Sequence, residues 1–318
     1  MSAAIVEEAA VRVLVVGDAN VDLVLRGDVV PRFGQAEQLL DSADLTLGSS
    51  AGIVAHGLAR LGIPTALAAT VGDDEFGRLT RGWLSEAGVD VSSLGVHPTL
   101  PTGLSVILSA PTDRSILTLL GSIPTLTGDA VLAAVKGASH VHFASYFLLP
   151  GLASQLPSLL ASLRSRGITT SLDTNWDPCE KWAGLAAVLP LVDVLLPNLE
   201  ELRAIAGSLG VLGGSDEDLA RRLAGLGPRV VVKAGREGGW SVAADSPVVR
   251  APALVVEAHD TTGAGDSFDA GYLAAVASGI ASESERLRWA TVAGSLSTRA
   301  AGGTPAQATL TELTDHLA

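Results

Sequence analysis

The chain has 318 residues, of which 47% are apolar, and 34 acidic against 21 basic side chains give it a formal net charge of −13. This length suits one large α/β domain with a smaller appendage, or two domains. With this excess of acidic residues, the sequence has no stripe of basic residues that could bind nucleic acid or anionic lipid. Both are therefore excluded as main partners. An anionic substrate must instead be held locally, by helix N-termini, a metal ion and the few cations.

Targeting signals and disulfides are not expected either. Glu7 and Glu8 stand where a secretory signal carries cations, and no apolar run approaches the roughly 20 residues of a membrane span. The single cysteine, Cys179, excludes an internal disulfide framework and fits a reducing compartment. We therefore expect a cytoplasmic protein without a membrane partner.

The first apolar run, residues 11–16, ends in Gly17 and predicts a buried parallel strand followed by a turn. Asn20 and Asp22 come next, and an extended segment places both on one side. Ligands favour the carboxyl ends of parallel strands. Both side chains can therefore bind the hydroxyls of a polyol, although a solvated turn is the alternative on local grounds.

Two stretches lack a long helical period. Residues 23–47 scatter apolar side chains among charges and predict short strands and loops. Residues 102–120 alternate apolar and polar side chains on both sides of the turn residues 111–114, which predicts a hairpin. The two stretches can pair into a small β sheet outside the core.

The remaining chain alternates strand and helix signals, which indicates an α/β fold with right-handed parallel crossovers. Small residues at 48–52 lead into a helix that Gly62 closes, and a final helix is expected over residues 287–298. Apolar strands are expected at residues 65–70, 140–143, 168–172, 194–197 and 229–232.

Polar side chains follow two of these strands. Asn198 and Glu201 are three residues apart at a predicted helix start, where they can hold magnesium-bound water and phosphate or form a plain helix cap. Lys233 begins the run Lys-Ala-Gly-Arg-Glu-Gly and can neutralise a terminal phosphate. A surface lysine at a strand end is the alternative.

The stretch that carries most chemistry is residues 260–268, Asp-Thr-Thr-Gly-Ala-Gly-Asp-Ser-Phe. It lies between an apolar strand expected to end near Val256 and a helix with three-to-four-residue apolar spacing that Gly279 terminates. The first-turn N–H groups of a helix have no intrahelical partner, and glycines let an anion approach the backbone. This stretch therefore predicts an anion hole.

Asp266 lies inside the same turn. We expect the helix amides to keep its carboxylate ionised, so that it accepts the proton of a hydroxyl that attacks a phosphoryl group beside it. The alternative is that Asp260 or Thr262 merely caps the helix and Gly263 makes the turn.

The string resembles the C-terminal signature of the ribokinase-like (PfkB) carbohydrate kinases, D-T-x-G-A-G-D, at every fixed position. The resemblance implies a three-layer α/β/α sandwich with a mostly parallel central sheet and a small β lid. The core then comprises residues 1–22, 47–98 and 121–318, and the lid comprises 23–46 and 99–120. In this family the lid covers the sugar and often pairs with the lid of a second subunit, which implies a homodimer.

The resemblance also implies roles for individual residues. Asp266 matches the catalytic base, and the amides of Gly263, Ala264 and Gly265 match the group that stabilises the transferring phosphate. Substrate-binding residues are implied at Asn20, Asp22, Gly48 and Ser49. Nucleotide-binding residues are implied at Asn198, Lys233, Gly235, Gly238 and Asp260, and magnesium ligands at Asn198 and Glu201. The resemblance therefore implies ATP and Mg²⁺ as cofactors. K⁺ is a further candidate, because residues 302–305 resemble the turn that lines the family's adenine and potassium pockets.

Departures from the family pattern bear on the substrate. Ser49 replaces a glycine of the first signature, and Ile53 replaces a sugar-binding asparagine. Ile53 would leave a substrate hydroxyl unpaired, which predicts poor activity on ribose unless Ser49 or Ser50 compensates. Asp177 stands where many sugar-acid and fructose kinases carry arginine, which argues against a carboxylated sugar. His56 is expected to be a packed or solvated helix histidine.

The sequence thus predicts an ATP-dependent sugar kinase. A nucleoside kinase of the same family and a sugar-binding member that has lost catalysis are the alternatives. A dinucleotide enzyme is disfavoured because no G-x-G-x-x-G follows the first strand, and a Walker-type kinase because the chain has no Gly-Lys dipeptide.

Overall fold

The computed structural model describes residues 13–35, 37–110 and 114–317, so the expectations for residues 1–12 and for the hairpin tip at 111–113 lie outside the described residues. A nine-stranded sheet has the order β13-β12-β11-β10-β9-β8-β1-β4-β5. Neighbours from β11 to β5 are parallel, whereas β12 and β13 are antiparallel. Its strands are β1 (Val13–Val16), β4 (Thr65–Gly72), β5 (Leu94–His97), β8 (His140–Phe143), β9 (Thr169–Leu172), β10 (Val194–Leu195), β11 (Arg229–Lys233), β12 (Gly239–Val242) and β13 (Val249–Ala251).

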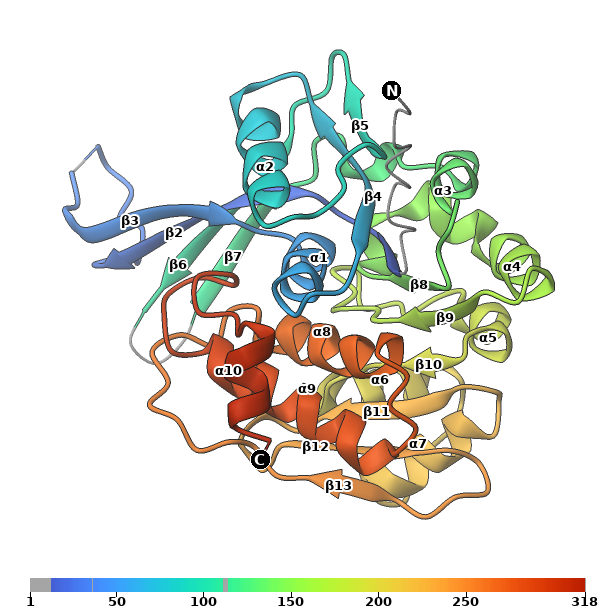
Figure 1. Ribbon diagram of the computed structural model, residues 1–318. Coiled ribbons are helices and arrows are strands. Elements are labelled where there is room, and N and C mark those ends of the chain that lie inside the picture. The colour runs from blue at the N-terminus through green and yellow to red at the C-terminus, as the bar shows by residue number, and fades with distance from the viewer. Residues whose placement is uncertain (1–12, 36, 111–113, 318) are drawn as a thin grey trace, which may run out of the picture.

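Helices cover both faces of this sheet, as Figure 1 shows. Because side chains alternate along a strand, Leu14 and Val16 of β1 join the core under α3 to α7, whereas Val13 and Val15 join the core under α1, α2, α8, α9 and α10. The expected three-layer α/β/α sandwich with a mostly parallel sheet is confirmed. The helices are α1 (Ser50–Arg60), α2 (Glu75–Glu86), α3 (Gly128–Ala134), α4 (Pro150–Ser165), α5 (Leu185–Val188), α6 (Leu199–Ser208), α7 (Asp216–Ala224), α8 (Ala264–Ala277), α9 (Glu283–Ser297) and α10 (Leu310–Asp315).

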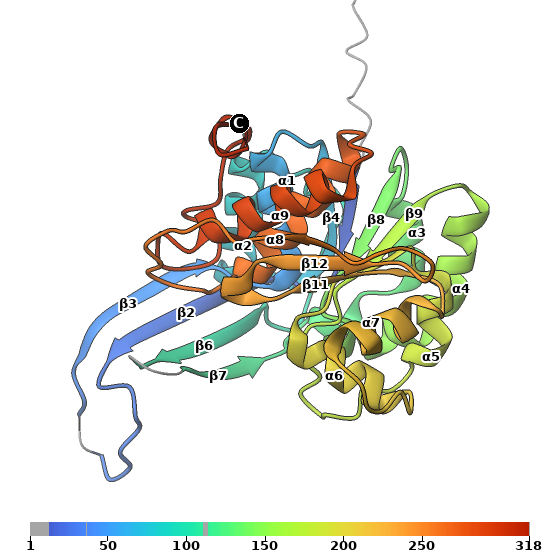
Figure 2. The ribbon, with the colours of Figure 1, turned by 90° about the horizontal axis from the view of Figure 1, so that it is seen from below.

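A second, four-stranded sheet projects from one side of the sandwich (Figure 2). Its order is β3-β2-β6-β7, with β2 parallel to β6 and both outer pairs antiparallel. The hairpin expected at residues 102–120 is confirmed by β6 and β7. Residues 23–47 contain the expected strands and a loop: 23–27 belong to β2, 40–47 form β3, and the described residues between them are not in a strand, but each strand is eight residues long rather than short. β3 is exposed over most of its length, so it forms without the apolar pattern of a buried strand. The strands of this small sheet are β2 (Asn20–Gly27), β3 (Leu40–Leu47), β6 (Gly103–Ser109) and β7 (Arg114–Leu119).

Two expectations for the C-terminal third are wrong. β13 ends at Ala251, so no strand reaches Val256; Val255 is 97% exposed, and the apolar side chains after β13 therefore do not mark a buried strand. α9 is followed by α10, which buries Leu313 in the core. Across the described residues, no helix combines the length and the apolar character needed to cross a bilayer.

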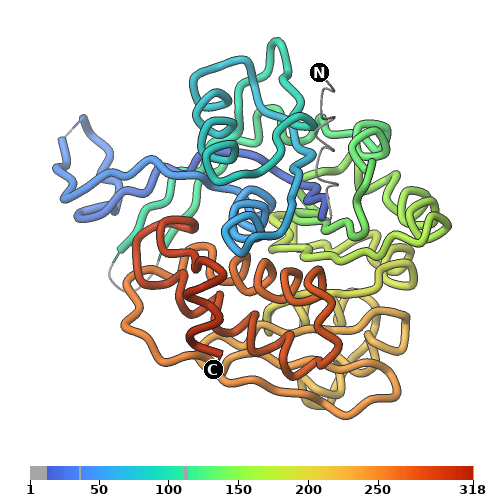
Figure 3. Tube along the Cα trace, viewed as in Figure 1, coloured from blue at the N-terminus to red at the C-terminus, as the bar shows by residue number. Residues whose placement is uncertain are grey.

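The register of the large sheet brings the strand ends together. Val16 pairs with Phe143, Phe143 with Leu172, and Leu172 with Leu195. The polar residues that follow these strands therefore meet at one edge, where ligands bind in open parallel sheets. α1 and α8 lie side by side there, and Figure 3 traces them next to each other although over 200 residues separate them in the chain.

Candidate active site

The N-terminus of α8 carries no side-chain cap. Its N-cap residue is Gly263, with a left-handed φ of 69° that glycine adopts without strain. Asp260 and Thr262, the alternative caps, bond to each other instead: Oδ1 of Asp260 accepts hydrogen bonds from N (2.9 Å) and Oγ1 (2.7 Å) of Thr262. Ala264 N donates to the carbonyl O of Thr261 (3.2 Å), whereas no side chain caps the first-turn amides of Gly265 and Asp266, which stay available to an anion. Gly263 makes the turn, but neither Asp260 nor Thr262 caps the helix as the alternative required.

Asp266 lies in this first turn and faces α1. Ser50 Oγ, at the first residue of α1, donates a hydrogen bond to Asp266 Oδ1. Burial raises the pKa of Asp266 to about 7; the Ser50 hydrogen bond and Lys233 oppose this, while the carboxylates of Asp173 and Asp18 add to it. Burial thus works against the expectation that Asp266 stays an ionised carboxylate, because it brings the pKa of this side chain close to neutral pH. A pKa near 7 suits a general base.

Asn20 and Asp22 lie on β2, at its buried end, so the solvated-turn alternative is wrong. Asn20 Nδ2 donates to Asp22 Oδ1 (3.0 Å) and Ser105 Oγ (3.4 Å). Burial raises the pKa of Asp22 to about 7, and the Arg114 charge opposes this rise. A Cβ on Gly48 would lie 2.2 Å from Asp22 Oδ1, so Gly48 is the residue that leaves room for this carboxylate.

The two halves of the site are near each other. The Asp18 carboxylate, buried after β1, raises the pKa of both Asp22 and Asp266 by charge repulsion. Asp18 itself is held in place because its Oδ1 accepts a hydrogen bond from the backbone N of Ala51 (3.1 Å). The N-terminus of α1 thus lies beside the predicted base and the predicted polyol-binding pair.

Ser49 and Ile53 have structural roles in α1. Ser49 has a left-handed φ of 68°, a conformation that favours glycine, and it caps the helix, since its side chain accepts a hydrogen bond from Gly52 N (3.0 Å). Ile53 is 3% exposed, and its Cδ1 would be 2.4 Å from a Cβ on Gly303. A Cβ on Gly263 would lie 3.2 Å from the same Cδ1, so Ile53 packs between Gly303 and the start of α8, and its effect on a substrate hydroxyl stays a prediction.

The predicted nucleotide side is organised by a capping box. Asn198 Oδ1 accepts from Glu201 N, and Glu201 Oε2 accepts from Asn198 N, both at 2.9 Å. Burial and the Asp173 charge raise the pKa of Glu201 to about 7. Gly235 has open space where a Cβ would lie, whereas a Cβ on Gly238 would be 2.2 Å from the carbonyl O of Ala251. Gly235 can thus face a ligand, and Gly238 permits close packing.

Lys233 and Asp260 are engaged with the protein itself. Lys233 Nζ donates to Asp173 Oδ2 (2.6 Å) and Asp269 Oδ2 (3.2 Å) and is 11% exposed, so it is not a surface lysine. Asp260 Oδ2 accepts a hydrogen bond from Gly302 N (3.0 Å) and lies 3.5 Å from Arg26 Nη2 of the small sheet. Asp260 therefore ties the turn before α8 to the loop after α9 and to β2.

Several site residues were not predicted. Asp18 follows the first strand directly, and Asp269 lies one helical turn after Asp266; these positions were available signals. Ser50 was considered only as a source of a hydroxyl for the sugar. Arg114 gives no signal in the sequence, because it reaches the site through the pairing of β7 in the small sheet, where its Nη1 donates to Thr262 Oγ1 (3.0 Å).

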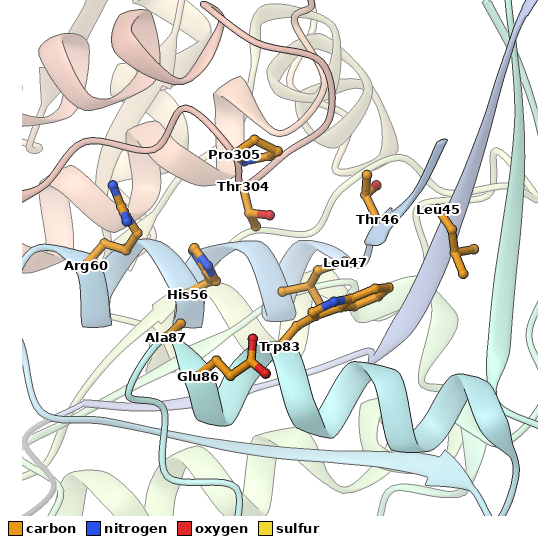
Figure 4. A pocket seen from close by; sticks show the side chains of 10 residues that line it. All are labelled: Leu45, Thr46, Leu47, His56, Arg60, Trp83, Glu86, Ala87, Thr304 and Pro305. Atoms are coloured by element: carbon orange, nitrogen blue, oxygen red, sulfur yellow. The ribbon is translucent and has the colours of Figure 1, made fainter. Parts of the chain in front are cut away.

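A cavity of 510 Å³ lies next to α1 and α2 but contains none of the predicted site residues (Figure 4). His56, Arg60, Trp83 and Glu86 are among its lining residues. His56 Nδ1 lies 2.6 Å from Oε1 of Gln307, and burial lowers the His56 pKa. His56 is therefore a packed helix histidine, which confirms the expectation for it.

Comparisons with known proteins concern the family and the fold. A family model described as pfkB family carbohydrate kinase matches residues 11–310. An ATP-dependent ribose-1-phosphate kinase from Halopiger xanaduensis is 31% identical over 83% of this chain and 84% of its own length. A fructokinase from Klebsiella pneumoniae is 30% identical over 92% of this chain and 94% of its own length. The structure of Arabidopsis thaliana ribokinase complexed with ribose and ATP has a TM-score of 0.84 at 24% identity and covers 97% of this chain and 99% of its own.

Proposed function

The chain belongs to the pfkB family of carbohydrate kinases, and on that premise we propose that it transfers the γ-phosphate of ATP to a hydroxyl of a small carbohydrate. One observation carries the proposal. Asp266, with a pKa near 7, lies in the uncapped first turn of α8 and close to the buried Asp22 and Asn20 pair. Base, anion hole and polyol-binding groups then share one site.

The reaction follows from this arrangement. The substrate hydroxyl oxygen attacks the γ-phosphorus, the bond between γ-phosphorus and the bridging oxygen of ADP breaks, and the hydroxyl proton passes to the Asp266 carboxylate. The amides of Gly263, Gly265 and Asp266 stabilise the equatorial oxygens of the transferring group, and Ala264 N, which donates to Thr261 O, keeps the turn in shape. Asp22 and Asn20 accept and donate hydrogen bonds to the other hydroxyls, which fixes the one that reacts.

ATP and Mg²⁺ are part of the proposal. Within the described residues, no group of three or more His, Cys, Asp or Glu side chains is arranged to hold a metal. Magnesium requires fewer protein ligands, because substrate phosphates and water complete its octahedron. The buried Glu201 carboxylate, with Asn198 beside it, fits such a partial site. Bound magnesium supplies charge neutralisation for the phosphates.

An ATP-coupled screen of sugars and nucleosides tests the function. We expect Mg²⁺-dependent ADP release with a pentose or hexose and loss of it with excess EDTA. Release with nucleosides alone identifies the nucleoside kinase alternative, and binding of sugar without ADP release identifies a member that has lost catalysis. Replacing KCl by NaCl in the same assay tests the open question of K⁺.

A sugar phosphate is a second candidate acceptor. Arg114 of β7 contacts Thr262 of the catalytic turn and acts by its charge on Asp22, so a guanidinium lies at the polyol site. One relative is named as a ribose-1-phosphate kinase. If a phosphate binds Arg114, Arg114→Met lowers kcat/KM at least about tenfold for ribose 1-phosphate but not for ribose. Arg166→Met, at an exposed arginine after α4, is the matched control.

The small sheet is proposed to act as a lid and as a dimer interface. Ile116, Leu117 and Leu119 of β7 are 51%, 58% and 54% exposed, and exposed apolar groups on an edge strand favour pairing with a second copy. Light scattering should therefore give a dimer, and Leu117→Glu should shift it toward monomer. A monomeric wild type contradicts this interface.

A cytoplasmic location, where ATP is abundant and thiols stay reduced, completes the proposal.

A further inference from the structure

Lys233 is a buried cation surrounded by acids. It ends β11, and its ammonium lies between the carboxylates of Asp173 (1% exposed) and Asp269 (0% exposed). Burial alone would lower the pKa of Lys233, but Asp173, Asp269 and Glu201 together raise it above its ordinary value. Lys233 therefore stays charged. The neighbouring carboxylates already compensate its positive charge, so no phosphate is needed for that purpose.

The ammonium also lies directly under the predicted anion hole. A Cβ on Gly265 would be 3.8 Å from Lys233 Nζ and 3.5 Å from its Cδ. Asp269, the second partner of Lys233, is on the same helix as Asp266 and one turn further along. The first turn of α8 is thus connected to β11 through the side chain of Lys233.

A chain of hydrogen bonds leads from Lys233 to the base. Asp173 accepts from Lys233 through Oδ2, and through Oδ1 it accepts from the backbone N of Asn175 (3.0 Å). Asn175 Nδ2 donates to Ser50 Oγ (3.2 Å), and Ser50 Oγ donates to Asp266 Oδ1. These hydrogen bonds form a continuous series from Lys233 to Asp266. The orientation of the Asp266 carboxylate therefore depends on Lys233 through Asp173, Asn175 and Ser50.

Two residues in or next to this series of hydrogen bonds have a strained backbone, which surrounding contacts must hold in place. Asn175 has a left-handed φ of 52°, and its Oδ1 accepts from the N of Ser145, whose φ is 55°. Non-glycine residues adopt this conformation at a cost and keep it only when surrounding contacts fix it. The Lys233 to Asp173 pair is one of those contacts.

We infer that Lys233 is a positioning residue for the kinase reaction rather than a ligand of the nucleotide: held by Asp173 and Asp269, it orients Asp266 through Asn175 and Ser50. The inference rests on the proposed function for its kinetic readout. It gives the motif position a different role from the phosphate contact expected from the sequence.

The test begins with the wild type and Asp266→Asn, which establish phosphate transfer independently of Lys233. Lys233→Met should then lower kcat about 100-fold, as expected for a base displaced by about 1 Å, and change the ATP dissociation constant less than about twofold. Lys136→Met, an exposed lysine after α3, is the matched control and should change neither. A loss of ATP affinity with kcat preserved makes Lys233 a phosphate ligand and overturns the inference.

Two further variants separate positioning from simple charge balance. Lys233→Met leaves buried carboxylates unpaired and should lower Tm, whereas the double variant Lys233→Met/Asp269→Asn should recover much of the Tm while kcat stays low. Recovery of kcat as well shows that Lys233 only neutralises its neighbours. Ser50→Ala should lower kcat too, and its effect should not add to that of Lys233→Met, because both act through Asp266. Full additivity contradicts the hydrogen-bond chain.

A measurement without turnover keeps this inference separate from the proposed function. The titration of the Asp266 carboxyl can be followed by ¹³C NMR in the wild type and in Lys233→Met. The pKa should rise in the variant, since Lys233 opposes the upward shift that burial and the facing carboxylates of Asp173 and Asp18 impose. An unchanged Asp266 pKa overturns the inference even if no acceptor sugar is found.

Discussion

Asp266→Asn should inactivate the protein and stabilise it at the same time. The amide cannot take a proton from the substrate hydroxyl, and general-base catalysis contributes about 10²–10⁴ to the rate. Asn keeps the size of the side chain and an oxygen that can accept the hydrogen bond from Ser50. The uncapped amides of α8 also remain, so ATP affinity should be preserved.

The stability gain follows from the sign of the pKa shift. The pKa of Asp266 rises from 3.8 to about 7 on folding, so the native state binds its proton more tightly than the unfolded state. Stability is therefore lost as pH increases from about 4 to 7, and the full penalty is present above pH 7. A shift of about three units corresponds to at most about 4 kcal/mol, and the partial exposure of Asp266 reduces this to about 1–3 kcal/mol.

Urea unfolding at pH 5 and pH 8 measures this penalty directly. The free energy of unfolding of Asp266→Asn should exceed that of the wild type by about 1–3 kcal/mol at pH 8 and by roughly two-fifths of that amount at pH 5. Asp245→Asn, at an exposed aspartate, is the matched control and should show no such difference. An advantage of Asp266→Asn that is equal at both pH values, or turnover near the wild-type rate, refutes the reasoning.

Three other predictions concern the same site. Asp22→Ala should raise the sugar KM about 30- to 150-fold and leave the ATP KM nearly unchanged, because a shielded carboxylate bonding two hydroxyls contributes about 2–3 kcal/mol; equal effects on both constants argue against a sugar contact. Gly48→Ala should also raise the sugar KM, since its Cβ would lie 2.2 Å from Asp22 Oδ1. Gly82→Ala, in α2 with open space at the Cβ position, should instead stabilise the protein by about 0.5–1 kcal/mol. The wild-type kcat/KM for sugar should rise with pH up to about 7 and then level off, as ionisation of Asp266 and Asp22 requires, and a flat profile from pH 5 to 8 contradicts both pKa values.

The parallel strands β1, β4 and β8 to β11 of the large sheet were predictable because they are largely buried on both faces, whereas β5, β12 and β13 were not predicted. Runs such as His140–Phe143 and Arg229–Lys233 stand out between turn residues, and both form strands there. β3 and the loop after β13 were misjudged for one physical reason. Exposed strands and exposed loops can carry the same mixture of apolar and polar side chains, and only pairing with β2 makes residues 40–47 a strand.

Individual site residues were predictable where the local backbone sets the chemistry. A glycine at the start of α8 and an acidic side chain in its first turn follow from helix geometry, and the structure places Gly263 and Asp266 in those positions. The role of Asp266 as base stays a proposal. Ser49 and Ile53 could not be assigned from their spacing. What each side chain does depends on where α1 meets the loop after α9, and in the folded protein Gly303 supplies the space that Ile53 fills.

The pKa of the base was mispredicted because desolvation is a property of the assembled site. The helix amides near Asp266 favour its charged form, as local reasoning holds, but Asp18 and Asp173 arrive from the ends of two other strands and remove water as they bring charge. Lys233, whose charge lowers the pKa of Asp266, is bound by two of the acids, Asp173 and Asp269. A buried excess of carboxylates therefore remains in a chain of net charge −13, and it destabilises the site until ligands bind. If the protein binds magnesium and substrate hydroxyls as proposed, they would supply positive charge and hydrogen-bond donors here, so the features that suit Asp266 to the proposed role of base would also favour binding of the proposed substrates.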